Sequence, residues 1–423
     1  MALFGTDRRV LVLGLARMAD ALGNSFLIVV LPLFIASGRV PLGNIVGAHV
    51  SAFGLFDLRV TQSVLVGVAL SLFGFLNSFS QPFTGRLSDR TGKRRAFILL
   101  GLVLLAAASG AYVFVSNYWV VLALRAVQGF GAALTIPATV ALVNDLSTSR
   151  DRGGSFGVFN AFRLVGFGLG PVIAGLVVGV SGFDAAFLVA VAGALVSFTL
   201  VGLLISDPEE TEAAAASDLS VRIRGTDHLF DPVFTLGVAT VVMGLGIALF
   251  ATLETQVNAQ LAQPEFMFGL EFGAVTIANV LFQIPIGRAS DLYGRRPFLL
   301  WGFAIMIPST LAQGYAPTPA TMLVARFVQG VSVAMVFAPA LALAGDLARE
   351  GESGTKLSVL TMAFGLGTAL GPLVSGLLVA YGFVVPFAAG AALAVVALAL
   401  VYTQVDETVS PDVEAEGGPA PQD

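Results

Sequence analysis

The sequence predicts an all-α membrane protein with 12 transmembrane helices, arranged as two pseudo-symmetric six-helix bundles. Three observations predict this fold: the composition, the number of long apolar segments and an internal repeat. Of the 423 residues, 56% are hydrophobic and only 12% are charged, whereas soluble domains carry about 25% charged residues. With no Cys and two His residues, the chain offers no disulfide and no cluster of transition-metal ligands.

A short charged motif occurs in both halves of the chain, 202 residues apart. It reads Gly85-Arg-Leu-Ser-Asp-Arg-Thr-Gly-Lys-Arg-Arg95 in the first half and Gly287-Arg-Ala-Ser-Asp-Leu-Tyr-Gly-Arg-Arg296 in the second. We expect both copies to be short loops at the membrane surface, because their charges cannot enter hydrocarbon cheaply. Other segments repeat at an offset of 201 or 202 residues: Asn77 and Gln81 with Asn279 and Gln283, Arg125-x-x-Gln128-Gly129 with Arg326-x-x-Gln329-Gly330, Asp145 with Asp346, and Gly170-Pro171 with Gly371-Pro372. A common offset over separate segments indicates a duplicated domain, which is one way in which secondary transporters are built.

Twelve segments are long and apolar enough to span a membrane, since a spanning helix needs about 20 mostly apolar residues. Six lie in the predicted N-terminal bundle, residues 1–205, and six in the predicted C-terminal bundle, residues 232–403. The polar residues 206–231 are predicted to form a linker, and the acidic residues 404–423 a disordered tail. The predicted spans are 10–36, 62–85, 96–115, 119–143, 155–180, 185–205, 232–256, 268–287, 297–315, 320–344, 357–381 and 384–403.

The basic residues predict the orientation of the chain. If both termini lie on one side, sixteen of the 22 Lys and Arg residues fall on that side, two on the other side and four inside spans. Because positive charge is retained on the cytoplasmic side, we expect a multi-pass protein of the cell membrane with cytoplasmic termini and linker. The longest loop on the outer side, residues 38–61, is expected to hold a short surface helix.

Three motifs in this sequence resemble motifs of the major facilitator superfamily. The charged motif resembles the family signature between helices 2 and 3, although its second copy departs from it at Ala289 and Leu292. The Arg125-x-x-Gln128-Gly129 segment resembles the helix 4 motif. Gly166-x-x-x-Gly170-Pro171-x-x-x-Gly175 resembles the helix 5 motif of the 12-helix drug–proton antiporters, with Ala174 in place of a glycine. The resemblance covers residues 8–403 and implies transport by alternating access.

The resemblance also implies a conformational latch at the charged motif. In the family, the acid and the arginines of this motif pair across to the other half and with an acid at the end of helix 4, which would hold the outward-open state. The alternative is that these charges only fix the topology. The residues concerned are Gly85, Asp89, Arg90, Gly92, Arg94 and Asp145 in the first half, and Asp291, Arg295 and Asp346 in the second.

Charges inside the predicted spans are candidate site residues, because a charge at the bilayer centre costs roughly 2.5–3.5 kcal/mol. Asp20 lies near mid-bilayer, three residues after Arg17 on the same helical face. The two are either a static ion pair or a site at which Asp20 exchanges protons or contacts a cationic substrate. For Arg125, beside Gln128, the resemblance implies a role in proton coupling, and packing against backbone carbonyls is the alternative. Arg163 is a further residue of the predicted cavity.

Two further features concern the outer mouth and the helix 5 motif. Glu254 and Glu271 lie near the outer ends of their predicted helices and are expected to be solvated residues at the mouth. Gly166, Gly170, Pro171 and Gly175 either pack closely against a neighbouring helix or bend their helix to seal the cavity.

These observations predict a secondary transporter, with proton-coupled efflux of small amphipathic molecules or metabolites as the expected activity. The alternatives are a facilitator or proton-coupled importer of sugars or organic acids and, in another class, a non-transporting receptor or scaffold. No phosphate-binding Gly-Lys-Ser/Thr loop is present, so ATP drive is not expected. We expect no enzyme activity and no cofactor, a proton gradient as driving force, a small-molecule substrate and the lipid bilayer as partners, no nucleic acid, and a monomer.

Overall fold

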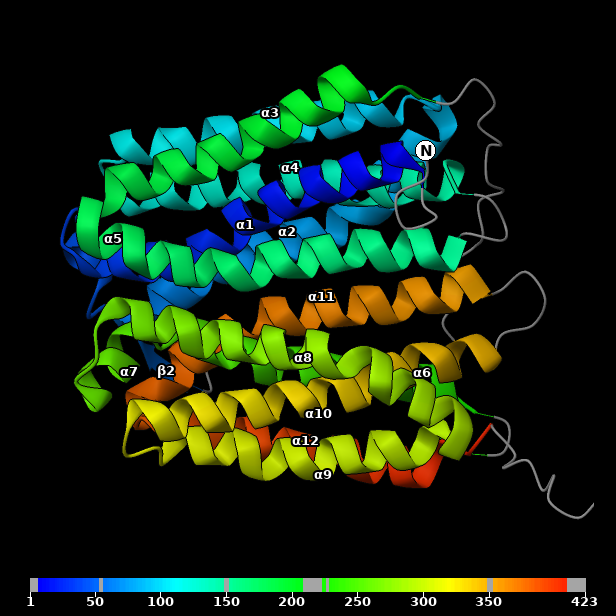
Figure 1. Cartoon of the computed structure of the whole chain (residues 1–423). Helices are drawn as coiled ribbons and strands as arrows, with labels where there is room; N and C mark the ends of the chain where they lie inside the picture. The colour runs from blue at the N-terminus through cyan, green and yellow to red at the C-terminus, as the bar shows by residue number, and fades with distance from the viewer. Residues whose placement is uncertain are drawn as a thin grey trace, which may run out of the picture.

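Two groups of long helices lie side by side along a common axis, the N-terminal half above the C-terminal half in Figure 1. The computed structural model describes residues 7–52, 56–147, 152–207, 223–225, 228–347 and 353–408. Residues 208–222 and 226–227 of the predicted linker, and residues 409–423 of the predicted tail, lie outside the described residues. The N-terminal half holds α1 (Arg8–Ala36), α2 (Gln62–Thr91), α3 (Arg94–Ala111), α4 (Tyr118–Asp145) and α5 (Arg152–Leu204). The C-terminal half holds α6 (Pro232–Ala248), α7 (Glu254–Leu261), α8 (Glu265–Tyr293), α9 (Arg295–Gly314), α10 (Pro319–Asp346), α11 (Ser353–Leu378) and α12 (Val385–Gln404).

Among the described residues, 11 helices are long and apolar enough to cross a membrane. One of them, Gly154–Leu204 within α5, has 51 residues and would be about 77 Å long if it were straight, more than twice the roughly 30 Å of a hydrocarbon core. It is broken at Gly182, whose φ of 77° is not helical, and therefore accounts for two crossings. The described residues thus provide twelve segments that are long and apolar enough to span a bilayer, as predicted.

The two ends of the bundle differ in the elements that form them. We call one end the basic face; it carries the start of α1, the α2–α3 and α8–α9 turns and the ends of α4 and α10. We call the opposite end the hairpin face; it carries α7 and the strands β1 (His49–Ala52) and β2 (Phe56–Arg59). Figure 1 shows the basic face at the right, with the N-terminus, and the hairpin face at the left.

The first loop differs from its prediction. Instead of a surface helix, residues 38–61 form only a three-residue 3-10 turn, Gly43–Ile45, followed by an antiparallel hairpin in which His49 pairs with Arg59. The alternation of apolar and polar residues in His49–Ala52 and Phe56–Arg59 is the signal of a strand, and the two segments pair with each other instead of forming a helix.

The charged motifs are also not the loops that were predicted. α2 continues through Gly85 to Thr91 and ends at Gly92, whose φ of 65° stops the helix in the left-handed conformation. α8 likewise continues to Tyr293, and Gly294, with a φ of 96°, separates it from α9. Polar residues remain helical beyond the apolar segment because no residue before the glycine ends the helix.

The predicted span 232–256 is shorter in the structure. α6 ends at Ala248, the 3-10 turn Leu249–Thr252 follows, and α7 is a separate short helix that begins at Glu254. Neither Gly nor Pro occurs between residues 249 and 256, so the sequence carries no obvious signal for this break.

The halves share a core only toward the hairpin face. A cluster of buried side chains there joins Phe26 and Phe187 of the N-terminal half to Phe250 and Phe268 of the C-terminal half. Toward the basic face, each half has its own cluster of buried side chains. The cluster that contains Leu13 consists wholly of residues of the N-terminal half, and the other consists wholly of residues of the C-terminal half. The two halves are therefore packed together at one end of the molecule.

Glycines mark the same difference. Gly67 of α2 lies against the backbone of Pro372 of α11, and Gly269 of α8 lies against the backbone of Pro171 of α5. Gly157 of α5 and Gly287 of α8, which lie toward the basic face, have open space beside them. The contact between the halves therefore ends part of the way along the helices.

Candidate functional site

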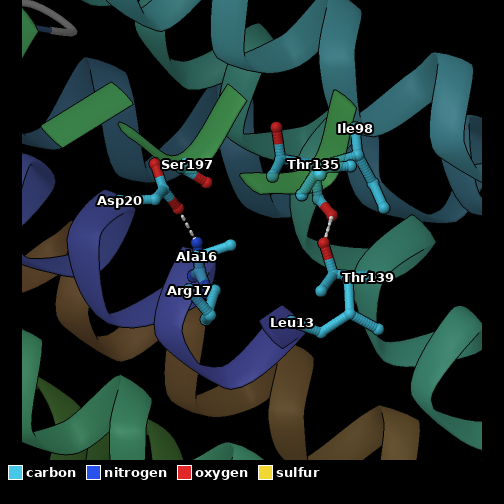
Figure 2. A pocket seen from close by; sticks show the side chains of 9 residues that line it. Leu13, Ala16, Arg17, Asp20, Ile98, Thr135, Thr139 and Ser197 are labelled. Atoms are coloured by element: carbon cyan, nitrogen blue, oxygen red, sulfur yellow. Dashed lines mark hydrogen bonds and ion pairs between the residues drawn. The ribbon is translucent and has the colours of Figure 1, made fainter. Parts of the chain in front are cut away.

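Arg17 and Asp20 form a buried ion pair on α1, as Figure 2 shows. Asn24, one turn further along α1, donates a hydrogen bond from Nδ2 to Asp20 Oδ1 at 3.1 Å. Asp20 borders a cavity of about 10 Å³ whose walls include the hydroxyl-bearing side chains of Thr135, Thr139 and Ser197. A cavity of that size holds about one water molecule. All of its walls belong to the N-terminal half, so Asp20 faces the interior of that half.

Arg163 of α5 is the second arginine of this region. It is half-buried, its Nε donates to Asn160 Oδ1 at 3.0 Å, and the charge of Arg17 lies close enough to repel it. Within the described residues, no carboxylate lies within ion-pair distance of its guanidinium. The structure thus brings together two arginines and one carboxylate, and Asp20 neutralises only Arg17.

Arg125 and Gln128 of α4 lie in a different buried cluster, toward the hairpin face. Arg125 Nε donates to the Ala69 carbonyl oxygen at 3.1 Å, its Nη1 donates to Gln128 Oε1 at 3.1 Å, and its guanidinium lies 4.5 Å from the centre of the Phe73 ring. Gln128 is completed by Ser109, which accepts from its Nε2 at 3.0 Å. Neither Arg125 nor Gln128 contacts Asp20, so the predicted coupling residues form two separate groups.

The latch residues of the N-terminal half meet at Arg94. Its guanidinium lies 2.5 Å from a carboxylate oxygen of Asp89 and 2.5 Å from one of Asp145. Gly85 packs beside Pro137 of α4, and Gly92 makes the turn before Arg94. Arg90 makes no ion pair among the described residues. Every ion pair of this group stays within one half, and the proposed pairing across the halves is not formed in this conformation.

The second half repeats this arrangement. Arg295 lies 2.6 Å from Asp346 and 3.4 Å from Asp291. The end of the described chain adds to it: the Thr408 hydroxyl donates to Asp346 Oδ2 at 2.8 Å, and the Glu407 carboxylate accepts from the Arg295 backbone N–H at 3.0 Å. Equivalent ion pairs in both halves agree with the internal repeat.

The helix 5 motif contacts two neighbours. Gly166 lies against the backbone of Met18, and Gly170 lies against Leu22 and Ser25, all of α1. The Pro171 carbonyl lies against Gly269 of α8, and Gly175 against Phe266 of α8. The motif therefore joins α5 to its own half along one face and to the opposite half along the next.

The prediction that Glu254 and Glu271 are solvated is wrong. Both Glu254 and Glu271 are 0% exposed, so neither is a solvated mouth residue. Neither carboxylate oxygen of Glu254 has a hydrogen-bond partner among the described residues. Burial, and secondly the like charge of Glu265, raise the pKa of Glu254 well above its usual range. Phe250 lies four residues before Glu254 and Val257 three residues after it, so helical spacing places all three on one face. This apolar spacing was the signal in the sequence that Glu254 is buried.

The described residues provide twelve spanning segments, in two halves that repeat one arrangement and pack together toward one face. Charged side chains are buried between these segments. These features define an integral membrane transport protein. The chain belongs to the Major Facilitator Superfamily, whose family model matches residues 13–236 and 234–421. Its fold and relatives are those of transporters and not of enzymes. Within the described residues, no group of three His, Cys, Asp or Glu side chains could hold a metal ion.

Comparison with individual proteins gives the same result. The quinolone resistance protein NorA of Staphylococcus aureus strain MRSA252 is 27% identical over 365 residues, which cover 83% of this chain and 90% of NorA. The solved structure of the nucleoside transporter NupG superposes with a TM-score of 0.73 at 14% identity, over 94% of this chain and 100% of that one. The human organic anion transporter MFSD10 superposes with a TM-score of 0.67 at 20% identity, over 93% and 99%. At these identities, the two structures show the fold alone.

Proposed function

We propose that this protein exports small amphipathic molecules or metabolites in exchange for protons, by alternating access between its two halves. The relative NorA is named for resistance to quinolones, which supports export. We place the protein in the cell membrane. The distribution of its basic residues supports an orientation with the basic face and both termini toward the cytoplasm. The shared core at the hairpin face then corresponds to a conformation that is closed to the outside and open to the cytoplasm.

The observation that carries proton coupling is the buried, unpaired carboxyl of Glu254. A carboxylate without a partner is costly to bury, so Glu254 is protonated when the hairpin face is closed. Glu254 begins α7, which contacts α1 of the opposite half. An acidic exterior protonates Glu254 in the outward-open state and thereby favours closure of the hairpin face. That closure is the return step of an exporter, after which the proton leaves toward the cytoplasm.

Asp20 is the second candidate for the proton. Its ion pair with Arg17 and the hydrogen bond from Asn24 engage both of its carboxylate oxygens, which supports a positioning role for Asp20. The water-sized cavity beside it supports the alternative, because a water could exchange a proton with Asp20. The latch at Arg94 is proposed to hold the opposite, outward-open conformation by pairing across the halves. We propose that the protein works as a monomer without a bound cofactor.

The test is a pH-jump experiment in proteoliposomes, preceded by a thermal-shift panel of amphipathic compounds to find a substrate. The proposal expects an inward proton gradient to drive substrate in the opposite direction, and Glu254→Gln to abolish this coupling while retaining exchange of substrate for substrate. Glu265→Gln, which alters an exposed neighbour, serves as the control. Accumulation of substrate together with protons would identify an importer and refute export. Loss of coupling in Asp20→Asn but not in Glu254→Gln would move the proton site to Asp20.

A further inference from the structure

The guanidinium of Arg163 lacks a counterion at a depth where a charge needs one. Arg163 lies 11 residues into α5 from Arg152, about 16 Å along the helix and therefore near the middle of a roughly 30 Å hydrocarbon core. Of its nitrogens, only Nε has a partner among the described residues, and the two terminal nitrogens are not fully buried. An intramembrane charge of this kind calls for a partner to be named.

The local charge balance gives the sign of that partner. Asp20 is already engaged by Arg17 and by the amide of Asn24, so no free negative charge remains to attract a cation. Arg17 and Arg163 repel each other, and the surplus is one positive charge. A ligand with one negative charge neutralises this surplus, whereas the second charge of a phosphate would stay uncompensated.

The position of Arg163 between the halves leaves room for such a ligand. α5 and α8 run in opposite directions and touch where Gly168 lies against Thr276. Arg163 is five residues beyond this contact toward the basic face, and at Gly157, further along, the space beside α5 is open. Arg163 therefore lies where the two halves begin to separate.

The facing helix carries amides at the same depth. Asn279 and Gln283 lie three and seven residues beyond Thr276 on the same face of α8. Asn279 Oδ1 is buried and has no hydrogen-bond partner among the described residues. Amide groups bind neutral polar atoms of a ligand whose charge is held elsewhere.

We propose that Arg163 is the subsite for a carboxylate group of the transported molecule, whose remaining polar atoms lie against Asn279 and Gln283. A planar guanidinium binds a carboxylate through two parallel N–H···O hydrogen bonds. The substrates are then amphipathic monocarboxylates that enter from the basic face. This assignment rests on the proposed function and narrows its substrate class.

The test uses the full chain in nanodiscs of neutral phosphatidylcholine and a probe pair that differs only in charge, 2-naphthoate and methyl 2-naphthoate. We expect the unchanged protein to prefer the acid, and Arg163→Gln to weaken binding of the acid by about 10- to 100-fold with little change for the ester. Arg163→Lys retains part of the preference, because it keeps the charge and loses the fork. Arg288→Gln, at an exposed arginine of α8, is the control for folding and should retain all of it.

Three results would overturn the subsite. The first is that the unchanged protein shows no preference for the acid, and the second is that Arg163→Gln keeps the full preference. The third is that adding anionic phosphatidylglycerol removes the preference while binding of the ester stays constant, which would make a lipid headgroup the occupant. Proton-driven exchange of uncharged amphiphiles is measured separately. If this exchange is present, the assignment as an exporter holds even when the carboxylate subsite is refuted.

Discussion

Arg125 and Arg326 occupy equivalent positions in the two halves and are held by equivalent contacts. Arg125 Nε donates to the carbonyl of Ala69 on α2, and Arg326 Nε donates to the carbonyl of Glu271 on α8. Each arginine also donates from Nη1 to a glutamine three residues later, at 3.1 Å and 2.7 Å. Both lie against an aromatic ring, Phe73 in one half and Phe250 in the other. This repeated contact fastens the fourth helix of each half to the second.

The first prediction follows for Arg326, which is fully buried. Arg326→Gln removes the hydrogen bonds to the Glu271 carbonyl and to Gln329, and should lower the free energy of unfolding by about 1.5–3 kcal/mol, the range for a hydrogen bond to a charged group. Thermal unfolding of the purified protein measures this change. Arg288→Gln, exposed on α8, should leave the unfolding temperature unchanged. An unaffected Arg326→Gln would show that the contact is not structural.

The second prediction concerns the contact between the halves at Gly67. A side chain at this position would strike the backbone of Pro372 and Leu373, which cannot move aside as a side chain can. We therefore expect Gly67→Val to shift the protein toward the conformation with an open hairpin face. Gly179→Val, where the space is open, is the matched control.

Because the chain has no cysteine, one introduced cysteine reports this shift. Ser63→Cys, buried at the same contact, should react with a maleimide faster in the Gly67→Val background than in the Gly179→Val background. Equal rates in the two would mean that the contact does not control access from the hairpin face.

The third prediction is a dependence of stability on pH that is due to Glu254. Because the pKa of Glu254 is raised in the folded protein above the unfolded value of about 4.3, the folded state binds the proton more tightly. The contribution of Glu254 to stability is therefore complete below the unfolded pKa and decreases as the pH rises toward the folded pKa. Unfolding temperatures of Glu254→Gln should decrease less with pH than those of the unchanged protein. Glu265→Gln removes only the second cause of the raised pKa and should flatten the dependence less; an equal flattening in both variants would contradict the assignment.

The fourth prediction separates the two acids that pair with Arg94. The Asp89 side chain is 36% exposed, and that of Asp145 is 16% exposed. Each variant leaves Arg94 with one carboxylate partner fewer. Asp89→Asn should cost at most about 1 kcal/mol of folding stability, because Asp89 is the more exposed partner, and Asp145→Asn, at the more buried partner, about 1.5–3 kcal/mol. If Asp89→Asn nevertheless stops transport in proteoliposomes, Asp89 acts in the other conformation, as a latch would.

The fifth prediction concerns Glu407, which follows α12. Its carboxylate accepts from the backbone N–H groups of Arg295 at 3.0 Å and Arg296 at 2.9 Å, the first residues of α9. Glu407→Ala should lower stability by about 0.5–2 kcal/mol, as for other helix N-terminal caps. Asp406→Ala alters an exposed neighbour that forms an ion pair with the partly exposed His228 and should have a smaller effect on the unfolding temperature.

The sequence predicted what depends on the length and repetition of apolar segments. The number of spanning segments follows from segment lengths, and the meeting of Arg94 with Asp145 is what the family resemblance of the charged motif implies. What could not be predicted depends on which helices are neighbours. Glu254 is buried because α7 turns back against α1, and Arg163 lies beside Arg17 because Gly166 lets α5 approach α1 closely. The packing of α7 and of α5 against α1 cannot be predicted from the residues of one helix alone.

The break at Gly182 leaves the two segments of α5 without any loop between them. The first segment touches α8 of the opposite half, and the second carries the Gly202 carbonyl, to which the Arg95 side chain donates. Because a single non-helical glycine joins them, the ends of the two segments at Gly182 stay adjacent whenever the first segment moves against α8. A movement that starts where the halves meet therefore reaches the second segment, and the Gly202 carbonyl that Arg95 contacts, only through this joint at the hairpin face.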